Sequence, residues 1–331
     1  MHRLARRFAL LALAAGIAGA AVPAALAQPA GYPSRVVTLV VPFAAGGSVD
    51  TAARIVAERL GERLGQPVIV ENAAGAAGTI GTQRAVRAAP DGYTLLFAVA
   101  TPINVAPLVT PGAVRYDALA DLQPVARVAN STFVLIGRTG LQAPDTAALV
   151  ELARRQHGKL NYGTDGVGGS MHLAAELIKQ RVGIDIVHVP YRSGPAVVAD
   201  VAGGQIDLAV MPLALVQPFV KDGKVRAYGV LQNERWPSLP EVPSLAELPA
   251  LKDLDDRSWY GVLAPARTDA AIVERLAAEL QALAAEPAVA RKLELAGLVP
   301  APLAGAAFRE LLQRERQTIA GVIAKAGIKT E

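Results

Sequence analysis

The sequence predicts an α/β protein of two domains, in which strands alternate with helices. Short runs of Val, Ile and Leu recur along the chain and are bounded by Gly, Pro or Asp, a pattern typical of buried strands. Stretches rich in Ala and Leu, with apolar residues at helical spacing, lie between these runs. This alternation favours sheets of mostly parallel strands. A chain of about 300 residues beyond its N-terminal segment favours two domains over one.

The expected elements follow this pattern from one end of the chain to the other. The strands are expected at Val36–Val41, Val68–Val70, Thr94–Val99, Phe133–Gly137, Leu160–Gly163, Ile186–Val189, Ile206–Val210, Val225–Leu231 and Tyr260–Ala264. The helices are expected at Thr51–Leu64, Ile80–Ala88, Thr146–Arg155, Ser170–Arg181, Pro195–Ala202, Leu213–Lys221, Asp269–Ala284, Pro287–Ala296 and Ala307–Ala326.

A compact set of units at 138–224 lies between two longer apolar runs. We interpret these runs, Val125–Gly137 and Val225–Leu231, as the two crossings between the domains. One domain is then discontinuous and the other is inserted into it. The first is expected to comprise residues 28–127 plus 228–331, and the second residues 128–227.

The first 27 residues have the organisation of a secretory signal peptide. Three arginines precede the apolar run Phe8–Ala21, and the small residues Ala25-Leu26-Ala27 suit a cleavage site before Gln28. The alternative, a retained membrane anchor, is disfavoured because the apolar run is shorter than the ~20 residues of a membrane span. We therefore expect export to the periplasm.

Charge and cysteine usage exclude several classes of protein. The formal net charge falls from +4 to +1 without residues 1–27, because they contain three Arg and no Asp or Glu. Basic residues do not cluster with aromatic residues, so nucleic-acid binding is not expected. The chain has no Cys, which excludes a thiol nucleophile, a disulfide and a thiolate metal site. We expect a monomer without metal or cofactor.

The run Pro42–Asp50 predicts an anion site. It joins the strand ending at Val41 to the helix expected from Thr51, and its glycines permit a tight turn. The first N–H groups of a helix lack internal partners, and the helix dipole adds partial positive charge there. An anion can therefore be held without Arg or Lys. The candidate ligand-binding residues are Phe43, Ala44, Ala45, Gly46, Gly47, Ser48 and Asp50, of which Asp50 has the alternative role of satisfying free N–H groups at the helix start.

A second glycine-rich turn, at Leu160–His172, repeats this arrangement in the other domain. Ligands of open α/β sheets bind beyond the carboxyl ends of the strands, so the two turns should face each other across a cleft. The candidates here are Thr164, Asp165, Gly168, Gly169, Ser170 and His172, with Ser170 alternatively an N-cap and His172 alternatively a packing residue. Thr101 and Asn104 follow the strand Thr94–Val99 and are expected in the cleft. His188 is expected to be structural, and Arg192 to form a surface or hinge salt bridge.

The whole chain beyond the signal peptide resembles the Bug family, the TctC-type solute-binding proteins of tripartite tricarboxylate transporters. The resemblance is carried by Tyr32-Pro33-Ser34-Arg35, Val40–Asp50, Gly65–Val68, Val70-Glu71-Asn72, Ala74-Gly75, Gly78, Ala89–Leu95, Gly158–Tyr162, Ser170 with His172, Val187–Tyr191, Gly203–Asp207, Pro240–Ser244 and Ala326-Gly327-Ile328.

The resemblance implies a type II periplasmic-binding-protein fold, with two α/β lobes joined by two crossing strands and a ligand cleft between them. It implies capture of a small carboxylate by domain closure and delivery to a membrane permease. It also implies that backbone N–H groups, hydroxyls and water hold the carboxylate. A sensor for a signalling partner is the alternative. An enzyme on the same fold is disfavoured, because the candidate nucleophile Ser170 and the candidate base His172 are two residues apart in one helix and point apart.

Three positions depart from the family pattern. Asp165 and Gly169 stand where small hydroxyl residues are usual, Val210-Met211-Pro212 where a polar residue commonly follows the strand, and Thr101–Asn104 where a polar stretch is usual. If Asp165 faces the cleft, it should repel a second carboxylate and favour an amine. If Met211 lines the cleft, an apolar end is favoured. The sequence leaves these alternatives open.

Overall fold

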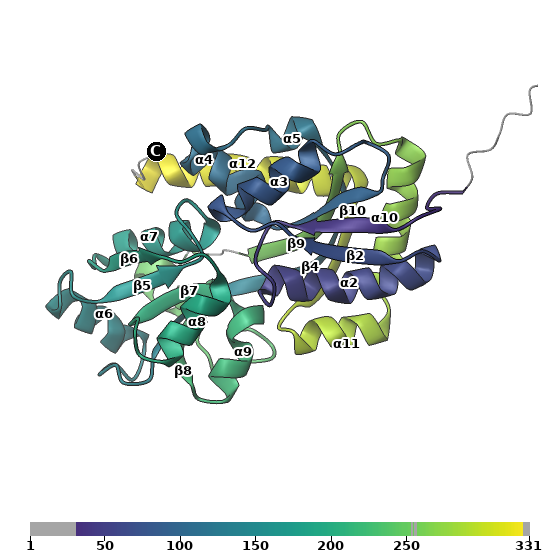
Figure 1. Ribbon diagram of the computed structural model, residues 1–331. Coiled ribbons are helices and arrows are strands. Elements are labelled where there is room, and N and C mark those ends of the chain that lie inside the picture. The colour runs from purple at the N-terminus through teal and green to yellow at the C-terminus, as the bar shows by residue number, and fades with distance from the viewer. Residues whose placement is uncertain (1–30, 253, 255–256, 327–331) are drawn as a thin grey trace, which may run out of the picture.

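The computed structural model describes residues 31–252, 254 and 257–326, which form two α/β lobes (Figure 1). The expected signal peptide at residues 1–27 lies outside the described residues. The first lobe begins with β1 (Val37–Val41), α2 (Ser48–Leu64), β2 (Val68–Asn72), α3 (Thr79–Val86), β3 (Thr94–Ala98), α4 (Ala106–Val109) and α5 (Ala118–Asp121). The strand β4 (Leu122–Arg138) then leads into the second lobe.

The second lobe contains α6 (Thr146–Arg155), β5 (Asn161–Thr164), α7 (Ser170–Val182), β6 (Val187–Pro190), α8 (Gly194–Ala202), β7 (Leu208–Pro212), α9 (Leu213–Lys221) and β8 (Val225–Val230). The chain returns to the first lobe through β9 (Arg257–Pro265), α10 (Ala270–Ala284), α11 (Pro287–Leu295), β10 (Val299–Ala304) and α12 (Gly305–Ala326). Short helical turns are η1 (Ala76–Gly78), η2 (Thr101–Val105), η3 (Pro111–Ala113), η4 (Leu245–Glu247) and η5 (Pro249–Leu251).

Each expected strand and helix overlaps an element of the same type. The sequence analysis missed β10, α4 and α5, which are short or contain proline. It also underestimated β4, which spans 17 residues. The expectation of mostly parallel strands was wrong. Pairing is parallel among β1, β2 and β3 and among β5, β6 and β7, but β4 and β9 pair antiparallel with their neighbours. Strands that cross between lobes return in the opposite direction, and this adds antiparallel ladders to the parallel units.

The strand β4 is part of both sheets. Its first half pairs with β9 and β10, for example Asn130 with Trp259, and its second half pairs with β7 and β8, for example Phe133 with Pro212. The expected first crossing at Val125–Gly137 lies within this strand. One continuous strand therefore links the two lobes and places Phe133 near the middle of the molecule.

The second crossing differs from the expected one. β8 pairs with the second-lobe half of β4, and the chain stays with the second lobe after Val230, since Trp236, Leu245 and Leu254 are buried in its core. The return at Val225–Leu231 was therefore predicted too early: the apolar character of β8 comes from burial in the second sheet, and the chain re-enters the first sheet with β9. We propose a second lobe that includes residues up to 254.

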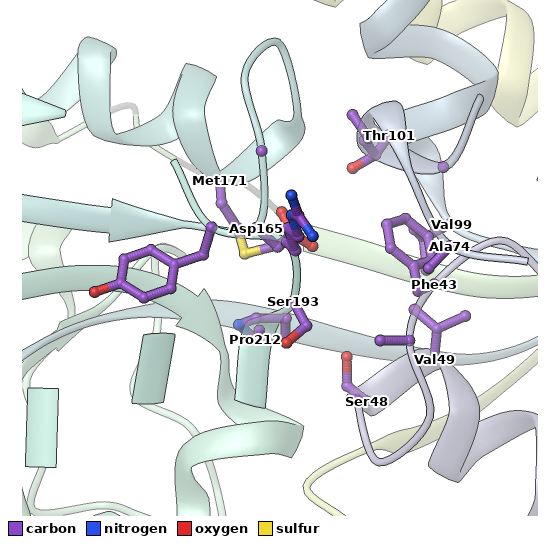
Figure 2. A pocket seen from close by; sticks show the side chains of 18 of the residues that line it. Phe43, Ser48, Val49, Ala74, Val99, Thr101, Asp165, Met171, Ser193 and Pro212 are labelled. Carbon is purple, nitrogen blue, oxygen red and sulfur yellow. The ribbon is translucent and has the colours of Figure 1, made fainter. Parts of the chain in front are cut away.

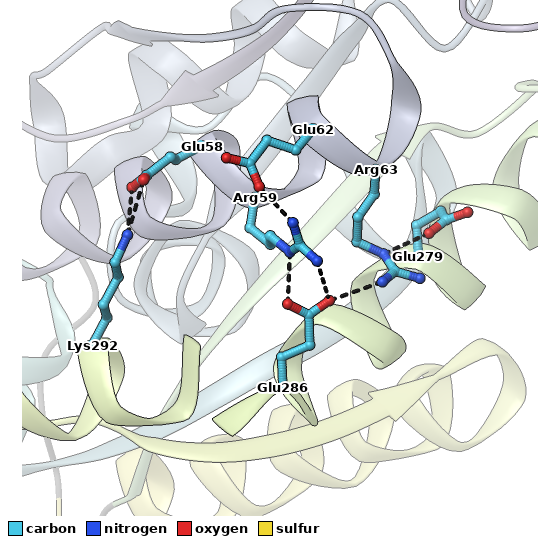
Figure 3. A network of polar contacts seen from close by, with 7 residues as sticks. All are labelled: Glu58, Arg59, Glu62, Arg63, Glu279, Glu286 and Lys292. Atoms are coloured by element: carbon cyan, nitrogen blue, oxygen red, sulfur yellow. Dashed lines mark hydrogen bonds and ion pairs between the residues drawn. The ribbon is translucent and has the colours of Figure 1, made fainter. Parts of the chain in front are cut away.

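The helix α2 is held against the first lobe by both core packing and a network of ion pairs. Its buried face carries Val49, Val56 and Leu60 at helical spacing. On the exposed side, Arg59 and Arg63 both contact Glu286 of the α10–α11 connection (Figure 3). Individual exposed pairs contribute little, but a network fixes the direction of a helix better than a single pair. The N-terminus of α2 is thereby directed toward the region between the lobes.

Within the described residues, no helix is both long and apolar enough to span a membrane.

Candidate functional site

A cleft of about 660 Å³ lies between the lobes. Its first-lobe wall consists of the β1–α2 loop, the loop at Ala74–Gly78 and the end of β3. Its second-lobe wall consists of the loops that follow β5, β6 and β7. Figure 2 shows Phe43, Ser48 and Thr101 facing Asp165, Met171 and Ser193 across this space. The two glycine-rich turns singled out in the sequence thus lie on opposite walls of one cleft.

The sequence-predicted residues divide into two groups. Those that line the cleft are Phe43, Ala44, Gly47, Ser48, Thr101, Asp165 and Met211. Those that lie in the surrounding loops, strand end and helix starts without lining it are Ala45, Gly46, Asp50, Asn104, Thr164, Gly168, Gly169, Ser170 and His172.

The β1–α2 loop presents the start of α2 to the cleft. Gly47 is the N-cap of this helix and has no side chain to satisfy the first N–H groups, so these groups remain available. Gly46 has a φ of 79°, a value that glycine adopts without strain. The Ser48 hydroxyl lies at the first helical position and next to the hydroxyl of Tyr260 on the floor of the cleft. The loop therefore offers N–H and O–H donors with no bulky side chain in front of them.

Asp50 stabilises this loop and does not line the cleft. Its carboxylate accepts hydrogen bonds from the Gly46 N–H (2.9 Å), Arg54 Nε (3.0 Å) and Asn72 Nδ2 (3.0 Å). Burial alone would raise the pKa of Asp50, but these hydrogen bonds outweigh it and hold the pKa below its usual value. The alternative reading of Asp50, as a partner for backbone N–H groups, agrees with this geometry.

The lobes are in direct contact beside the cleft. The Thr101 and Ser170 hydroxyls are 2.8 Å apart, and the Ser170 N–H donates to Thr101 Oγ1 at 3.3 Å. Nearby, a Cβ placed on Gly168 would lie 2.8 Å from Thr110 Cγ2, so this approach requires glycine. Ser170 is therefore occupied by a contact between lobes, which holds them close together around the cleft.

His172 is directed into the second lobe. Its Nδ1 accepts a hydrogen bond from the Gly168 N–H at 3.1 Å, and its ring stacks on that of His188 at 4.1 Å. The Nε2 atom of His188 is hydrogen-bonded to the Thr164 hydroxyl, and this hydroxyl donates to the Gly166 carbonyl. Burial lowers the pKa of His188 to about 4, and the charge of His172 adds to the effect. Thr164, His172 and His188 thus hold the loop in shape.

Asn104 contacts the C-terminal helix. Its Nδ2 donates to the Leu312 carbonyl at 2.9 Å and to Glu315 Oε2 at 2.5 Å, both on α12. The expectation that Asn104 lines the cleft was wrong. A helical turn at Thr101–Val105 follows β3 and rotates this side chain toward α12 while Thr101 stays at the cleft.

Two segments of the cleft wall were missed as site residues. The loop at Ala74–Gly78 lies opposite the Asp165 loop, and a Cβ on Gly166 would lie 3.7 Å from the Ala77 nitrogen. Ala76 and Ala77 have φ values of 46° and 51°, unusual for residues with a side chain and often found at functional sites. Ser193 precedes α8, and the Gly-Pro pair that starts this helix was a usable signal. Arg192, expected in a salt bridge, is instead exposed at the rim of the cleft.

Asp165 and Met211 both line the cleft. The two ligand preferences that the sequence left open, for an amine and for an apolar group, therefore apply to one site. Met211 lies with Phe43 and Phe133 in a largely apolar lining. Burial raises the pKa of the Asp165 carboxyl to about 7. The phenol of Tyr260, which faces Asp165, has its pKa raised by burial to about 12 and stays protonated at neutral pH. The site combines hydrogen-bond donors, apolar surface and one half-buried acid.

The sequence and this architecture match one known family. The model described as "Tripartite tricarboxylate transporter family receptor", TctC, matches residues 52–328. The chain belongs to the TctC family. This TctC-family protein is 33% identical to Protein BugT of Bordetella pertussis over 328 residues, which cover 98% of this chain and 99% of that one.

Two solved structures extend the comparison to the fold. The periplasmic binding protein BugD has a TM-score of 0.85 and 30% identity to this TctC-family protein, covering 91% of this chain and 100% of that one. The solved structure of the R. palustris protein Rpa4515 with adipate has a TM-score of 0.84 and 31% identity to this chain. The match covers 90% of this chain and 99% of that one. The expected two-lobed periplasmic-binding-protein fold is thereby confirmed, as is membership of the Bug and TctC group.

Proposed function

We propose that this protein captures a small carboxylate in the cleft between its lobes and delivers it to a membrane permease of the tripartite tricarboxylate type. The observation that carries the proposal is the convergence of helix starts on the cleft. The first residues of α2 and α8 line it from opposite lobes. Both helices direct free N–H groups and partial positive charge toward an anion in the cleft.

The composition of the wall supports a carboxylate held without a buried cation. Among the described residues, the basic side chain that lines the cleft is Arg192, and it is exposed at the rim. The Ser48 and Ser193 hydroxyls supplement the N–H groups, and ordered water can bridge the remaining distance. The similar R. palustris protein Rpa4515, solved with adipate, agrees with this ligand class.

Closure of the lobes follows from this arrangement. A ligand shifts an equilibrium between open and closed forms only through contacts that it makes better in the closed form. Donors from α2 and α8 belong to different lobes, so a carboxylate contacts both sets only when the lobes are close together. The closed form is the state offered to the permease. Residues 1–27 would export the protein to the periplasm, and we propose no catalytic role.

A thermal-shift screen tests this function. Protein starting at Gln28, freed of bound ligand by unfolding and refolding, is mixed with dicarboxylates, tricarboxylates, amino acids and aromatic acids. A ligand at 100 times its dissociation constant raises stability by ~2.7 kcal/mol. Ser48→Ala should reduce the shift, whereas Ser34→Ala, outside the cleft, should not. No stabilisation by any acid would contradict carboxylate binding.

A further inference from the structure

Asp165 is placed to contact a ligand directly. It is the first residue of the loop that follows β5 and lines the cleft, opposite the first-lobe residues Phe43 and Thr101 (Figure 2). Its carboxylate is close to the start of α7, since a Cβ on Gly169 would lie 3.8 Å from Asp165 Oδ1. The neighbouring residues Thr164 and Ser170 are both engaged in hydrogen bonds within the protein. Asp165 is therefore the polar side chain that this loop directs into the cleft.

Among the described residues, Asp165 has no cationic side chain as a partner, and its carboxyl is hydrogen-bonded by its own backbone N–H. Within the described part of the chain, no Arg, Lys or His forms an ion pair with it, and the other charged side chain of the lining, Arg192, is exposed at the rim. Tyr260 on β9 and Thr101 on η2 face it as neutral groups. Asp165 is half-buried at the cleft, and a carboxylate removed from water without a cation is costly, which raises its pKa.

A ligand with a positive group would supply the missing partner. An opposite charge within ~4–6 Å favours an ionised carboxylate, whereas a second carboxylate at that distance disfavours it. The N–H groups at the start of α2 attract the negative end of a ligand from the other lobe. The cleft thus has a donor-rich wall on one side and an acid on the other, and its lining includes the apolar side chains of Phe43, Phe133 and Met211.

We propose that Asp165 makes the cleft selective for a carboxylate whose far end carries a protonated amine, and that it excludes the matching dicarboxylate. The inference rests on the carboxylate-binding function proposed above. The carboxylate contacts the start of α2, the ammonium contacts Asp165, and the chain between them packs on the apolar lining. The apolar preference expected from Met211 and the amine preference expected from Asp165 then describe two parts of one ligand.

Matched pairs of acids test this selectivity by titration calorimetry at pH 8, where Asp165 is ionised. The pairs are 5-aminopentanoate with adipate, and 4-(aminomethyl)benzoate with terephthalate, which differ only in their far group. The variants are Asp165→Asn, which keeps the shape, and Asp222→Asn as the control. Asp222 follows α9, its side chain is 58% exposed, and it pairs with Lys224 outside the cleft.

In the unsubstituted protein, the amine of at least one pair should bind ~10- to 100-fold more tightly than its dicarboxylate. Asp165→Asn should abolish or reverse this preference, and Asp222→Asn should keep it. Between pH 6 and 8.5 the affinity for the amine should rise, because Asp165 loses its proton. This rise should be absent in Asp165→Asn. Its absence would assign the pH dependence of binding to Asp165 and not to Arg192, Tyr260 or the nearby His172.

Other outcomes overturn the inference in distinguishable ways. If adipate or terephthalate binds the unsubstituted protein as tightly as its amine, and Asp165→Asn changes neither, carboxylate binding stands and the selectivity is refuted. The variant Arg192→Gln gives a second way to overturn the inference. If it removes the preference for the amine as fully as Asp165→Asn does, Arg192 pairs with Asp165 when the lobes close, and direct contact between Asp165 and the amine is refuted. If none of the four acids binds any variant, the inference fails together with its ligand class, and the broad screen above shows whether another carboxylate binds.

Discussion

Replacing Asp165 by Asn should stabilise the protein, and the gain should grow with pH. The ordinary pKa of an Asp carboxyl is 3.8, and burial raises that of Asp165 to about 7. Between these values the folded protein binds a proton that the unfolded chain has released, so stability falls as pH rises through this window. A rise from 3.8 to about 7 amounts to ~4 kcal/mol, at ~1.4 kcal/mol per pKa unit.

The measurable effect is smaller because Asp165 keeps contact with water in the cleft. Allowing for this screening, we expect Asp165→Asn to gain ~1–3 kcal/mol at pH 8 relative to pH 4. At ~2–4 °C per kcal/mol, the thermal midpoint of the variant should exceed that of the parent by ~2–12 °C more at pH 8 than at pH 4.

The assay is thermal unfolding of ligand-free protein from pH 4 to pH 8, followed by circular dichroism. The hydrogen bonds of Asn change the stability by an amount that does not depend on pH, so the pH dependence of the difference between variant and parent is the quantity to compare. Asp222→Asn, at an exposed ion pair, serves as the matched control. A difference between variant and parent that stays constant from pH 4 to pH 8 would refute the reasoning that burial raises this pKa.

Three further perturbations test the loops around the cleft. Thr101→Val removes the hydrogen bond to Ser170 between the lobes, and should weaken ligand binding ~2- to 10-fold, measured by calorimetry. Asp50→Ala leaves the donors of the β1–α2 loop unpaired and should cost ~1–3 kcal/mol in urea unfolding, with Asp50→Asn costing less. His188→Gln should reduce acid destabilisation: the pKa of His188 is about 4 in the folded state against an ordinary 6.5, so the parent loses ~1–3 kcal/mol as pH falls through this range. An equal acid response in variant and parent would contradict the assignment of a buried, neutral His188.

Local sequence patterns were sufficient to predict most of the strands and helices, and to single out the two glycine-rich turns. The helix α2 was predicted at Thr51–Leu64 from apolar residues at helical spacing, such as Val56 and Leu60, and from the glycines that precede it. Both signals are encoded within a few adjacent residues. The same holds for the turn after β5, where Thr164, Asp165 and the glycines are consecutive.

Contacts between distant segments decided the remainder. The sequence placed the return to the first lobe at Val225–Leu231, because an apolar strand reads the same whichever sheet buries it. Asn104 was expected in the cleft, but a helical turn after β3 directs it to Glu315, 211 residues away in the sequence. Periodicity reports that a side chain is buried, and does not report which partner buries it.

The sequence by itself determined that two strand–turn–helix units carry glycine-rich turns, because backbone preferences and hydrophobic spacing are local properties. Only the tertiary structure decided that Asp165 and Met211 share one cleft, that Ser170 bonds Thr101 across the lobes, and that His172 stacks inside the second lobe. These outcomes depend on the direction of each side chain relative to a surface formed by remote segments. That surface exists only in the folded chain. The lack of a cationic side chain beside Asp165 is therefore a property of the fold and not of the local sequence.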